Sequence, residues 1–181
     1  MEPMILLLIK IVIFLVCSAF LLWYSWKPLK DARAHGFYRF FAWESILALI
    51  LLNADVWFRD PFSPLQVISW LLLAVCITLV IHGFYMLRVI GKPEGDFENT
   101  TALVKKGAYK YIRHPLYSSL LFLAWGAFLK DISIPSLILV ILSTVLLFLT
   151  GKMEEKENSA RFGKSYADYV RETRMFIPFV F

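Results

Sequence analysis

Two short stretches of the chain carry residues whose types and spacing could support chemistry. The first is the basic and aromatic stretch 103–117, in which Arg113, His114 and Pro115 are consecutive. Proline suits the first turn of a helix, where its missing N–H would have no partner anyway, so a helix is predicted to begin at Pro115. Arg113 and His114 would then lie beside the free N–H groups and positive dipole of that helix, which together favour an anion.

The second stretch is the acidic pair Glu154 and Glu155, which follows a long apolar run. Two neighbouring carboxylates near a membrane surface could bind a cation or accept a proton. Both stretches also have a purely structural interpretation. The basic loop could contact anionic lipid headgroups, and the acids could complement the dipole of a helix that begins near them.

The other residue types that bind metals or form disulfides show no useful spacing. His35, His82 and His114 are far apart in the chain, and Cys17 and Cys76 each lie inside an apolar run. Ligands of a structural zinc site usually occur in closely spaced pairs, so no metal is predicted. We expect His82 to be a packing histidine and the cysteines to be small buried hydrophobic residues.

The apolar runs that must position these residues are long enough to cross a membrane, except for the short run 116–129. The chain has 181 residues, of which 59% are hydrophobic and 18% charged, against about 45–50% and about 25% in soluble domains. A helical span needs about 20 mostly apolar residues. The candidate runs are residues 5–26, 37–57, 65–89, 116–129 and 132–150. Only Lys130 and Asp131 separate the last two, which are therefore predicted to form a helical hairpin.

Lysine and arginine are concentrated in alternate connections between these runs. Between the first two runs lie Lys27, Lys30, Arg33 and Arg39, and between the third and fourth lie Arg88, Lys92, Lys105, Lys106, Lys110 and Arg113. Segments 55–60 and 130–131 contain few basic residues. The positive-inside rule then predicts a multi-pass protein with its N terminus outside and its C terminus in the cytoplasm. The expected partner is a lipid bilayer, and no nucleic acid is expected.

The tail 152–181 is predicted to be helical and to pack on the membrane surface or over the site. Gly163 is expected to end one helix and Ser165 to cap the next. A one-sided stripe follows, made of Tyr166, Tyr169, Val170 and Thr173. The predicted fold class is therefore all-α: a polytopic membrane helix bundle of about five transmembrane helices. Its pocket would be built from the loop before the last hairpin and closed by the amphipathic tail.

The order of these features resembles the isoprenylcysteine carboxyl methyltransferase family, which belongs with the phospholipid N-methyltransferases. The resemblance lies in the segment LVKKGAYKYIRHPLY, the hairpin, the acidic pair, the segment FGKSYADY and the late Pro178. It covers residues 100–178, whereas the first three runs are similar only as generic membrane helices. We therefore expect a three-span membrane region, 1–99, and a methyltransferase-like region, 100–181. The chain lacks the GxGxxG fingerprint of a soluble dinucleotide-binding domain.

The resemblance implies S-adenosylmethionine as the methyl donor in a cytoplasm-facing pocket. It also implies a lipophilic acceptor that enters from the membrane, of the isoprenylcysteine carboxylate or phospholipid amine type. The donor contacts that it implies are Thr101, Ala102, Leu103, Val104, Tyr109, His114, Pro115, Leu116 and Tyr117. The catalytic residues would be Arg113, Glu154 and Glu155.

One position departs from the pattern of that family. In its carboxyl methyltransferases an arginine about one helical turn before the glutamate grips the acceptor carboxylate, and Thr150 occupies that position here. Threonine cannot form the charge pair, so an amine headgroup or another lipid-like nucleophile is favoured over a carboxylate.

Two other classes of protein remain open from the sequence. A nicotinamide-dependent membrane lipid or sterol reductase shares an Arg-His-Pro element with a downstream tyrosine, but a longer chain would be expected. A non-enzymatic membrane scaffold would show no stabilisation by a ligand. A conducting pore is disfavoured because no polar stripe runs through the apolar spans.

Overall fold

The computed structural model describes residues 2–94 and 100–180, and these residues confirm the all-α prediction. The helices are α1 (Glu2–Tyr24), α2 (His35–Leu52), α3 (Pro64–Val89), α4 (Pro115–Phe128), α5 (Ile134–Phe162) and α6 (Lys164–Glu172). Short 3₁₀ turns occur at Pro28–Lys30, Ala54–Val56 and Gly107–Lys110. The helix predicted to begin at Pro115 does so.

Four of these helices, α1, α2, α3 and α5, are long and apolar enough to cross a membrane. The fourth helix of the predicted five, α4, has 14 residues. At about 1.5 Å per residue it is about 21 Å long, which is shorter than the roughly 30 Å hydrocarbon core. The chain is therefore an integral membrane protein with four full-length candidate spans and one shorter apolar helix beside them.

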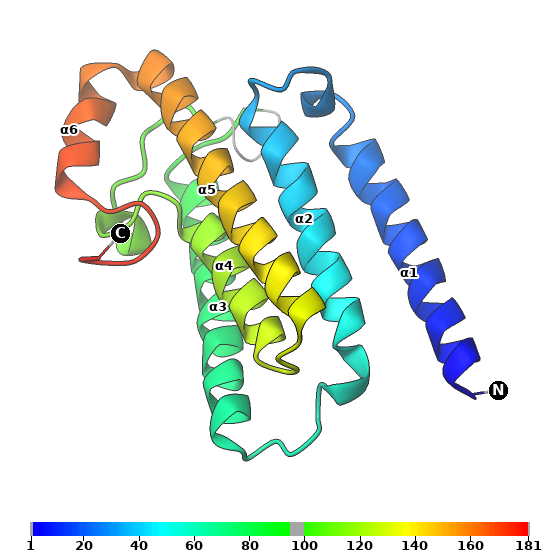
Figure 1. The fold of residues 1–181 in the computed structure, drawn as a ribbon. Helices are drawn as coiled ribbons and strands as arrows, with labels where there is room; N and C mark the ends of the chain where they lie inside the picture. Colours follow the sequence, from blue (N-terminus) through cyan, green and yellow to red (C-terminus); the bar gives the residue numbers. More distant parts are fainter. Residues whose placement is uncertain (1, 95–99, 181) are drawn as a thin grey trace.

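Successive helices of the bundle alternate in direction (Figure 1). The N terminus and the α2–α3 and α4–α5 connections lie at one end. The α1–α2 connection, the segment between α3 and α4, and the C-terminal tail lie at the other. The basic connections and both chemical stretches thus share one end of the bundle. That this end faces the cytoplasm stays a prediction.

The core lies where α4 and α5 pack against α2 and α3. The most extensive helix contacts are α2 with α5 and α3 with α4. Small or branched side chains with no exposed surface fill the centre, namely Ala42, Leu49, Ala124, Val140 and Leu147. Ser69 Oγ on α3 donates to the Gly126 carbonyl on α4 at 2.7 Å, so the two backbones lie close together. The predicted boundary at residue 99 falls in 95–99, outside the described residues, and the division stays a prediction.

The bundle end opposite the tail is closed by polar side chains that hold the hairpin turn. Asn53 Nδ2 donates to the Ala127 carbonyl at 2.9 Å, and Gln66 Nε2 donates to the Lys130 carbonyl at 3.1 Å. Lys130 Nζ donates back to Gln66 Oε1 at 3.1 Å and lies 3.3 Å from the centre of the Trp70 ring. The predicted hairpin is confirmed, and Lys130 is a buried residue within it.

The fifth helix is longer than predicted, and this corrects the interpretation of the acidic pair. α5 continues from the apolar run without a break to Phe162, so Glu154 and Glu155 lie inside a helix. The structural interpretation that these acids complement the dipole at a helix start is therefore wrong. No proline interrupts residues 150–162, and the polar composition of these residues hid the continuity of the helix.

The tail forms the predicted amphipathic helix with one corrected boundary. Gly163 ends α5 as expected, and its φ of 54° is a conformation that favours glycine. Gly163, not Ser165, also occupies the N-cap of α6. Tyr166 and Tyr169 are both 2% exposed, which confirms the buried face that the stripe predicted.

Candidate active site

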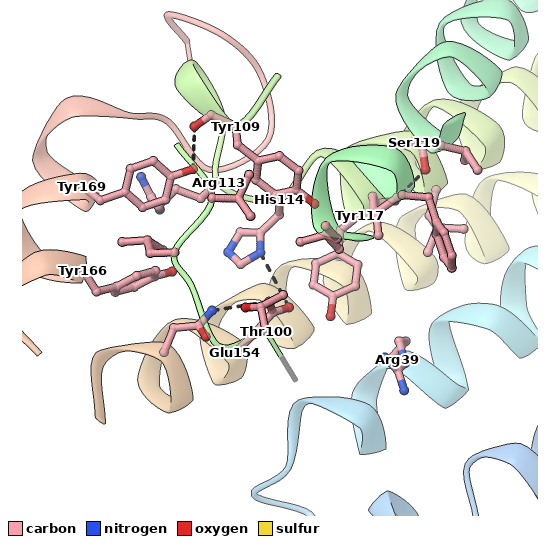
Figure 2. A pocket seen from close by; sticks show the side chains of 18 of the residues that line it. Arg39, Thr100, Tyr109, Arg113, His114, Tyr117, Ser119, Glu154, Tyr166 and Tyr169 are labelled. Carbon is pink, nitrogen blue, oxygen red and sulfur yellow. Dashed lines mark hydrogen bonds and ion pairs between the residues drawn. The ribbon is translucent and has the colours of Figure 1, made fainter. Parts of the chain in front are cut away.

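A cavity of about 310 Å³ lies at the tail end of the bundle (Figure 2). This volume falls within the range of about 300–1,000 Å³ that is typical of ligand pockets. Its walls come from α2, α3, the segment 100–114, α4, the end of α5, and α6. Residues from both chemical stretches therefore meet in one space.

Most of the residues implied by the resemblance line this cavity. They are Leu103, Val104, Tyr109, Arg113, His114, Leu116, Tyr117 and Glu154. Thr101 and Ala102 are not among the lining residues, and the Thr101 hydroxyl donates to the Lys92 carbonyl at 2.9 Å. Pro115 is buried in the first turn of α4, and Glu155 lies behind the wall against Arg113.

Arg113 and Glu155 form a largely buried ion pair that joins the loop before α4 to the end of α5. Arg113 Nε and Nη2 lie 2.7 and 2.6 Å from Glu155 Oε1, and the side chains are 8% and 13% exposed. Arg113 Nη1 also donates to the Thr173 carbonyl at 2.6 Å. One guanidinium thus fixes three separate segments relative to one another.

His114 lies between the two carboxylates and is almost completely buried, with its side chain 2% exposed. Its Nδ1 is 3.7 Å from Glu154 Oε2, and its Nε2 is 3.7 Å from Glu155 Oε1. These separations exceed a direct hydrogen bond, and Nε2 has no hydrogen-bond partner among the residues that the structure describes. The imidazole stacks on Tyr117 with ring centres 5.5 Å apart.

The C-terminal segment holds this loop in place through its backbone. The N–H groups of Arg113 and His114 donate to the carbonyls of Arg174 and Met175 at 2.8 and 3.2 Å. The N–H of Arg174 donates to the Tyr111 carbonyl at 3.0 Å. These bonds form a short parallel bridge. The segment after α6, residues 173–180, is therefore part of the site, and we call it the strap.

Close packing beneath His114 depends on Gly151. A Cβ atom at this position would lie 2.5 Å from Met175 Cε, 3.1 Å from Phe176 Cζ and 3.5 Å from His114 Cδ2. Glycine therefore lets the buried strap residues pass between α5 and the imidazole. Gly151 therefore helps to support the site, although it lies in α5 just before the polar residues.

His82 is a structural residue of α3 that supports the same loop, in agreement with the expected packing role. Its Nε2 accepts a hydrogen bond from the Ala108 N–H at 3.1 Å. This bond ties α3 to the 3₁₀ turn that carries Tyr109. Tyr109 is thereby positioned at the cavity wall with 7% of its surface exposed.

Two residues of α2, Arg39 and Trp43, line the cavity although the sequence did not indicate them. Arg39 was assigned to a basic connection, but it lies in α2 and is 4% exposed. Its guanidinium lies 4.7 Å from the centre of the Trp43 ring. The four-residue spacing between them is the signal that could have been used, because residues four apart meet on one helix face.

The end of α5 and the tail helix supply three further lining residues, Asn158, Tyr166 and Tyr169. Burial raises the pKa of Tyr166, and the charges of Glu155 and Glu154 raise it further. Burial also raises the pKa of Tyr169, with a smaller contribution from Tyr166. Both phenols therefore keep their protons at neutral pH and can act as hydrogen-bond donors.

The cavity is lined by both apolar and charged residues. Val80, Leu87, Leu103 and Val104 are suited to a flat aromatic ring. Glu154 also lines the cavity, with 25% of its side chain exposed. Among the residues that the structure describes, no group of three or more histidine, cysteine or acidic residues could hold a metal ion. This lining suits a ligand that contains both an aromatic base and charged groups.

Comparison with known proteins is consistent with this geometry. Residues 65–165 match the phospholipid methyltransferase family. The methanethiol S-methyltransferase of Crocosphaera subtropica is 28% identical over 121 residues, which cover 66% of this chain and 47% of the relative. That of Pseudomonas sp. GM41(2012) is 24% identical over 141 residues, which cover 77% and 54%. Methanethiol S-methyltransferase 1 of Bradyrhizobium diazoefficiens is 23% identical over 178 residues, which cover 92% and 53%.

The chain spans about half the length of these curated relatives. The family match includes α3, α4, the loop that carries Arg113 and His114, and the acidic pair on α5. It covers more than half of the chain and confirms the resemblance that the sequence indicated. The chain belongs to the phospholipid methyltransferase family.

Proposed function

We propose that this chain is an integral membrane methyltransferase that uses S-adenosylmethionine and acts on a lipophilic acceptor at the cytoplasmic surface. One observation carries the proposal. The loop that holds Arg113 and His114 and the end of α5 that holds Glu154 meet at a single cavity, and Arg113 contacts Glu155 behind its wall at 2.6 Å. The N terminus would then lie outside.

The residues of the cavity fit such a donor. Two buried polar atoms that line the cavity, His114 Nε2 and the Tyr166 hydroxyl, lack hydrogen-bond partners among the described residues. Tyr109 and Tyr117 present aromatic faces, which attract a sulfonium cation. Leu103 and Val104 would pack against the adenine. S-adenosylmethionine supplies an electrophilic methyl group on its sulfonium sulfur.

The protein contributes mainly alignment and exclusion of water. Glu155 is held by Arg113, so its role is to position the loop and His114. Glu154 faces the cavity and is the carboxylate that can attract a cationic acceptor or take the proton that an amine loses. Holding the reacting groups in line in a closed site accounts for a large part of such rate accelerations.

Several observations support a lipophilic acceptor without a carboxylate. The Thr150 hydroxyl is buried and donates to the Leu146 carbonyl at 2.7 Å, so it does not reach the cavity. A second cavity of about 400 Å³ is lined almost entirely by apolar residues of α3, α4, α5 and the strap. Phe176 lines it and also packs against His114. We propose that the acceptor approaches from the membrane through this second cavity.

The names of the relatives favour a thiol among the acceptor classes. A thiol and a phospholipid ammonium group each lose one proton on methylation, and Glu154 is the cavity carboxylate that can accept it. Purified chain in lipid nanodiscs should be supplied with methyl-labelled donor and, in turn, alkanethiols of increasing length, phosphatidylethanolamine and a prenylcysteine. We expect label in a lipophilic acceptor. No transfer to any of them, with stabilisation by NADPH but not by S-adenosylhomocysteine, would favour a reductase.

Tyr109 and Glu154 are expected to affect different kinetic constants. Tyr109→Ala removes an aromatic wall and should weaken S-adenosylhomocysteine binding about tenfold, or about 1.4 kcal/mol. Glu154→Ala should mainly lower kcat, because its carboxylate faces the acceptor side. Calorimetric Kd values and steady-state rates measure the two effects. Equal losses of donor affinity in both variants would contradict this division.

A further inference from the structure

Tyr166 is buried, but its hydroxyl makes no hydrogen bond to the residues that the structure describes. The residue is 2% exposed. The Asn158 side chain is the nearest polar neighbour and lowers the Tyr166 pKa as a weak hydrogen-bonding group, but its amide donates to Glu154 Oε1 at 3.4 Å and makes no well-formed bond to the phenol. The large majority of buried polar groups are hydrogen-bonded, so an unpaired one calls for an explanation.

Tyr169 provides a direct comparison on the same helix. It is also 2% exposed and lines the same cavity, but its hydroxyl donates to the Tyr109 carbonyl at 2.6 Å. α6 therefore buries one tyrosine that holds the fold together and another whose hydroxyl has no structural bond. Figure 2 shows the Tyr166 hydroxyl pointing toward the part of the cavity that contains His114 and Glu154.

The surroundings of this hydroxyl indicate the kind of ligand group that would meet it. Glu155 is paired with Arg113 at 2.6 Å and with Lys152 at 3.3 Å, whereas Glu154 lines the cavity with its Oε2 3.7 Å from His114 Nδ1. The methionyl end of S-adenosylmethionine carries an ammonium group, a sulfonium and a carboxylate. The ammonium group complements Glu154, and the carboxylate needs hydrogen-bond donors close by.

We propose that Tyr166 is a donor-binding residue whose hydroxyl donates a hydrogen bond to the α-carboxylate of the methionyl end. This inference rests on the proposed function and names the part of the donor that the tail helix recognises. The apolar lining near Leu87 and Leu103 then receives the adenosine. The tail helix thus contributes specificity for an amino-acid-bearing nucleoside.

The test compares Tyr166→Phe with the matched variant Tyr169→Phe in the full chain. Tyr166→Phe removes an unpaired hydroxyl, so the thermal midpoint without ligand should stay the same or rise. Its Kd for S-adenosylhomocysteine should increase at least about tenfold, the effect of one hydrogen bond to a charged group. Tyr169→Phe loses a satisfied bond and should lower the ligand-free midpoint.

The position of the contact is tested with 5′-methylthioadenosine, which keeps the adenosine and lacks the amino-acid group. We expect Tyr166→Phe to bind it as tightly as the unaltered chain. An equal loss for both ligands would place the contact on the adenosine and overturn the inference. An unchanged Kd for S-adenosylhomocysteine, or a midpoint lowered as much as in Tyr169→Phe, would also overturn it.

The same titrations separate this inference from the proposed function. If the unaltered chain binds S-adenosylhomocysteine and Tyr166→Phe binds it equally well, only the role of Tyr166 is rejected. If the unaltered chain binds neither ligand, the proposed function and the inference are both rejected.

Discussion

Replacing Arg113 with alanine is expected to lower the free energy of unfolding by about 3–5 kcal/mol, as when one partner of a buried ion pair is removed. Glu155 would be left 13% exposed without its guanidinium, and the Thr173 carbonyl would lose its 2.6 Å hydrogen bond. Because the loop, α5 and the tail meet at Arg113, binding of S-adenosylhomocysteine should be lost as well. Thermal unfolding in detergent, with and without that ligand, measures both effects.

Two controls make the Arg113 result specific. Arg171 and Asp168 form an exposed pair at 3.6 Å, with side chains 81% and 46% exposed, so Arg171→Ala should change stability by less than about 0.5 kcal/mol. Combining Arg113→Ala with Glu155→Ala should cost less than the sum of the single changes, since no charge is left unpaired. Strict additivity would show that the two side chains do not act as a pair.

Replacing Phe176 with alanine is expected to cost about 3–5 kcal/mol, the usual range for a buried phenylalanine. Phe176 is 2% exposed, its ring lies 5.9 Å from the His114 ring, and its carbonyl accepts from Ser118 Oγ at 2.7 Å. Truncation leaves a hole beneath His114, so donor affinity should fall together with stability. Thermal unfolding and calorimetric titration of the same sample measure both.

Phe179 is the matched control for this substitution. It lies three residues further along the strap and is 82% exposed. Phe179→Ala should leave both the midpoint and the Kd nearly unchanged. A mobile lid would give a different pattern: Phe176→Ala would leave stability intact and change only the rates of ligand entry and release.

The helices were predictable from the sequence because long apolar runs have few alternatives in a membrane. The C-terminal end of α5 was not predictable. Beyond Thr150 the helix is polar, and its continuation depends on packing against the strap and α6. Ser165 was a reasonable cap by residue type, but Gly163 has the backbone conformation that separates the two helices.

The candidate site was predictable where the resemblance supplied an order of motifs, as for His114, Tyr117 and Glu154. Hydrophobic patterns alone could not have brought these residues together. Arg39 was missed because a charge at the start of an apolar run is usually a connection residue. Its burial follows from the packing of α2 against α5, which no local pattern reveals. Tyr166 was recognised as part of a buried stripe, but only its unpaired hydroxyl suggests a ligand contact.

Titration of S-adenosylhomocysteine into the purified chain by calorimetry tests the central claim most directly. We expect saturable binding of one ligand per chain and a rise in the thermal midpoint, with both lost in Arg113→Ala and retained in Arg171→Ala. Absence of heat and of stabilisation for a chain that is folded and helical would contradict a donor site where the loop and the acids meet.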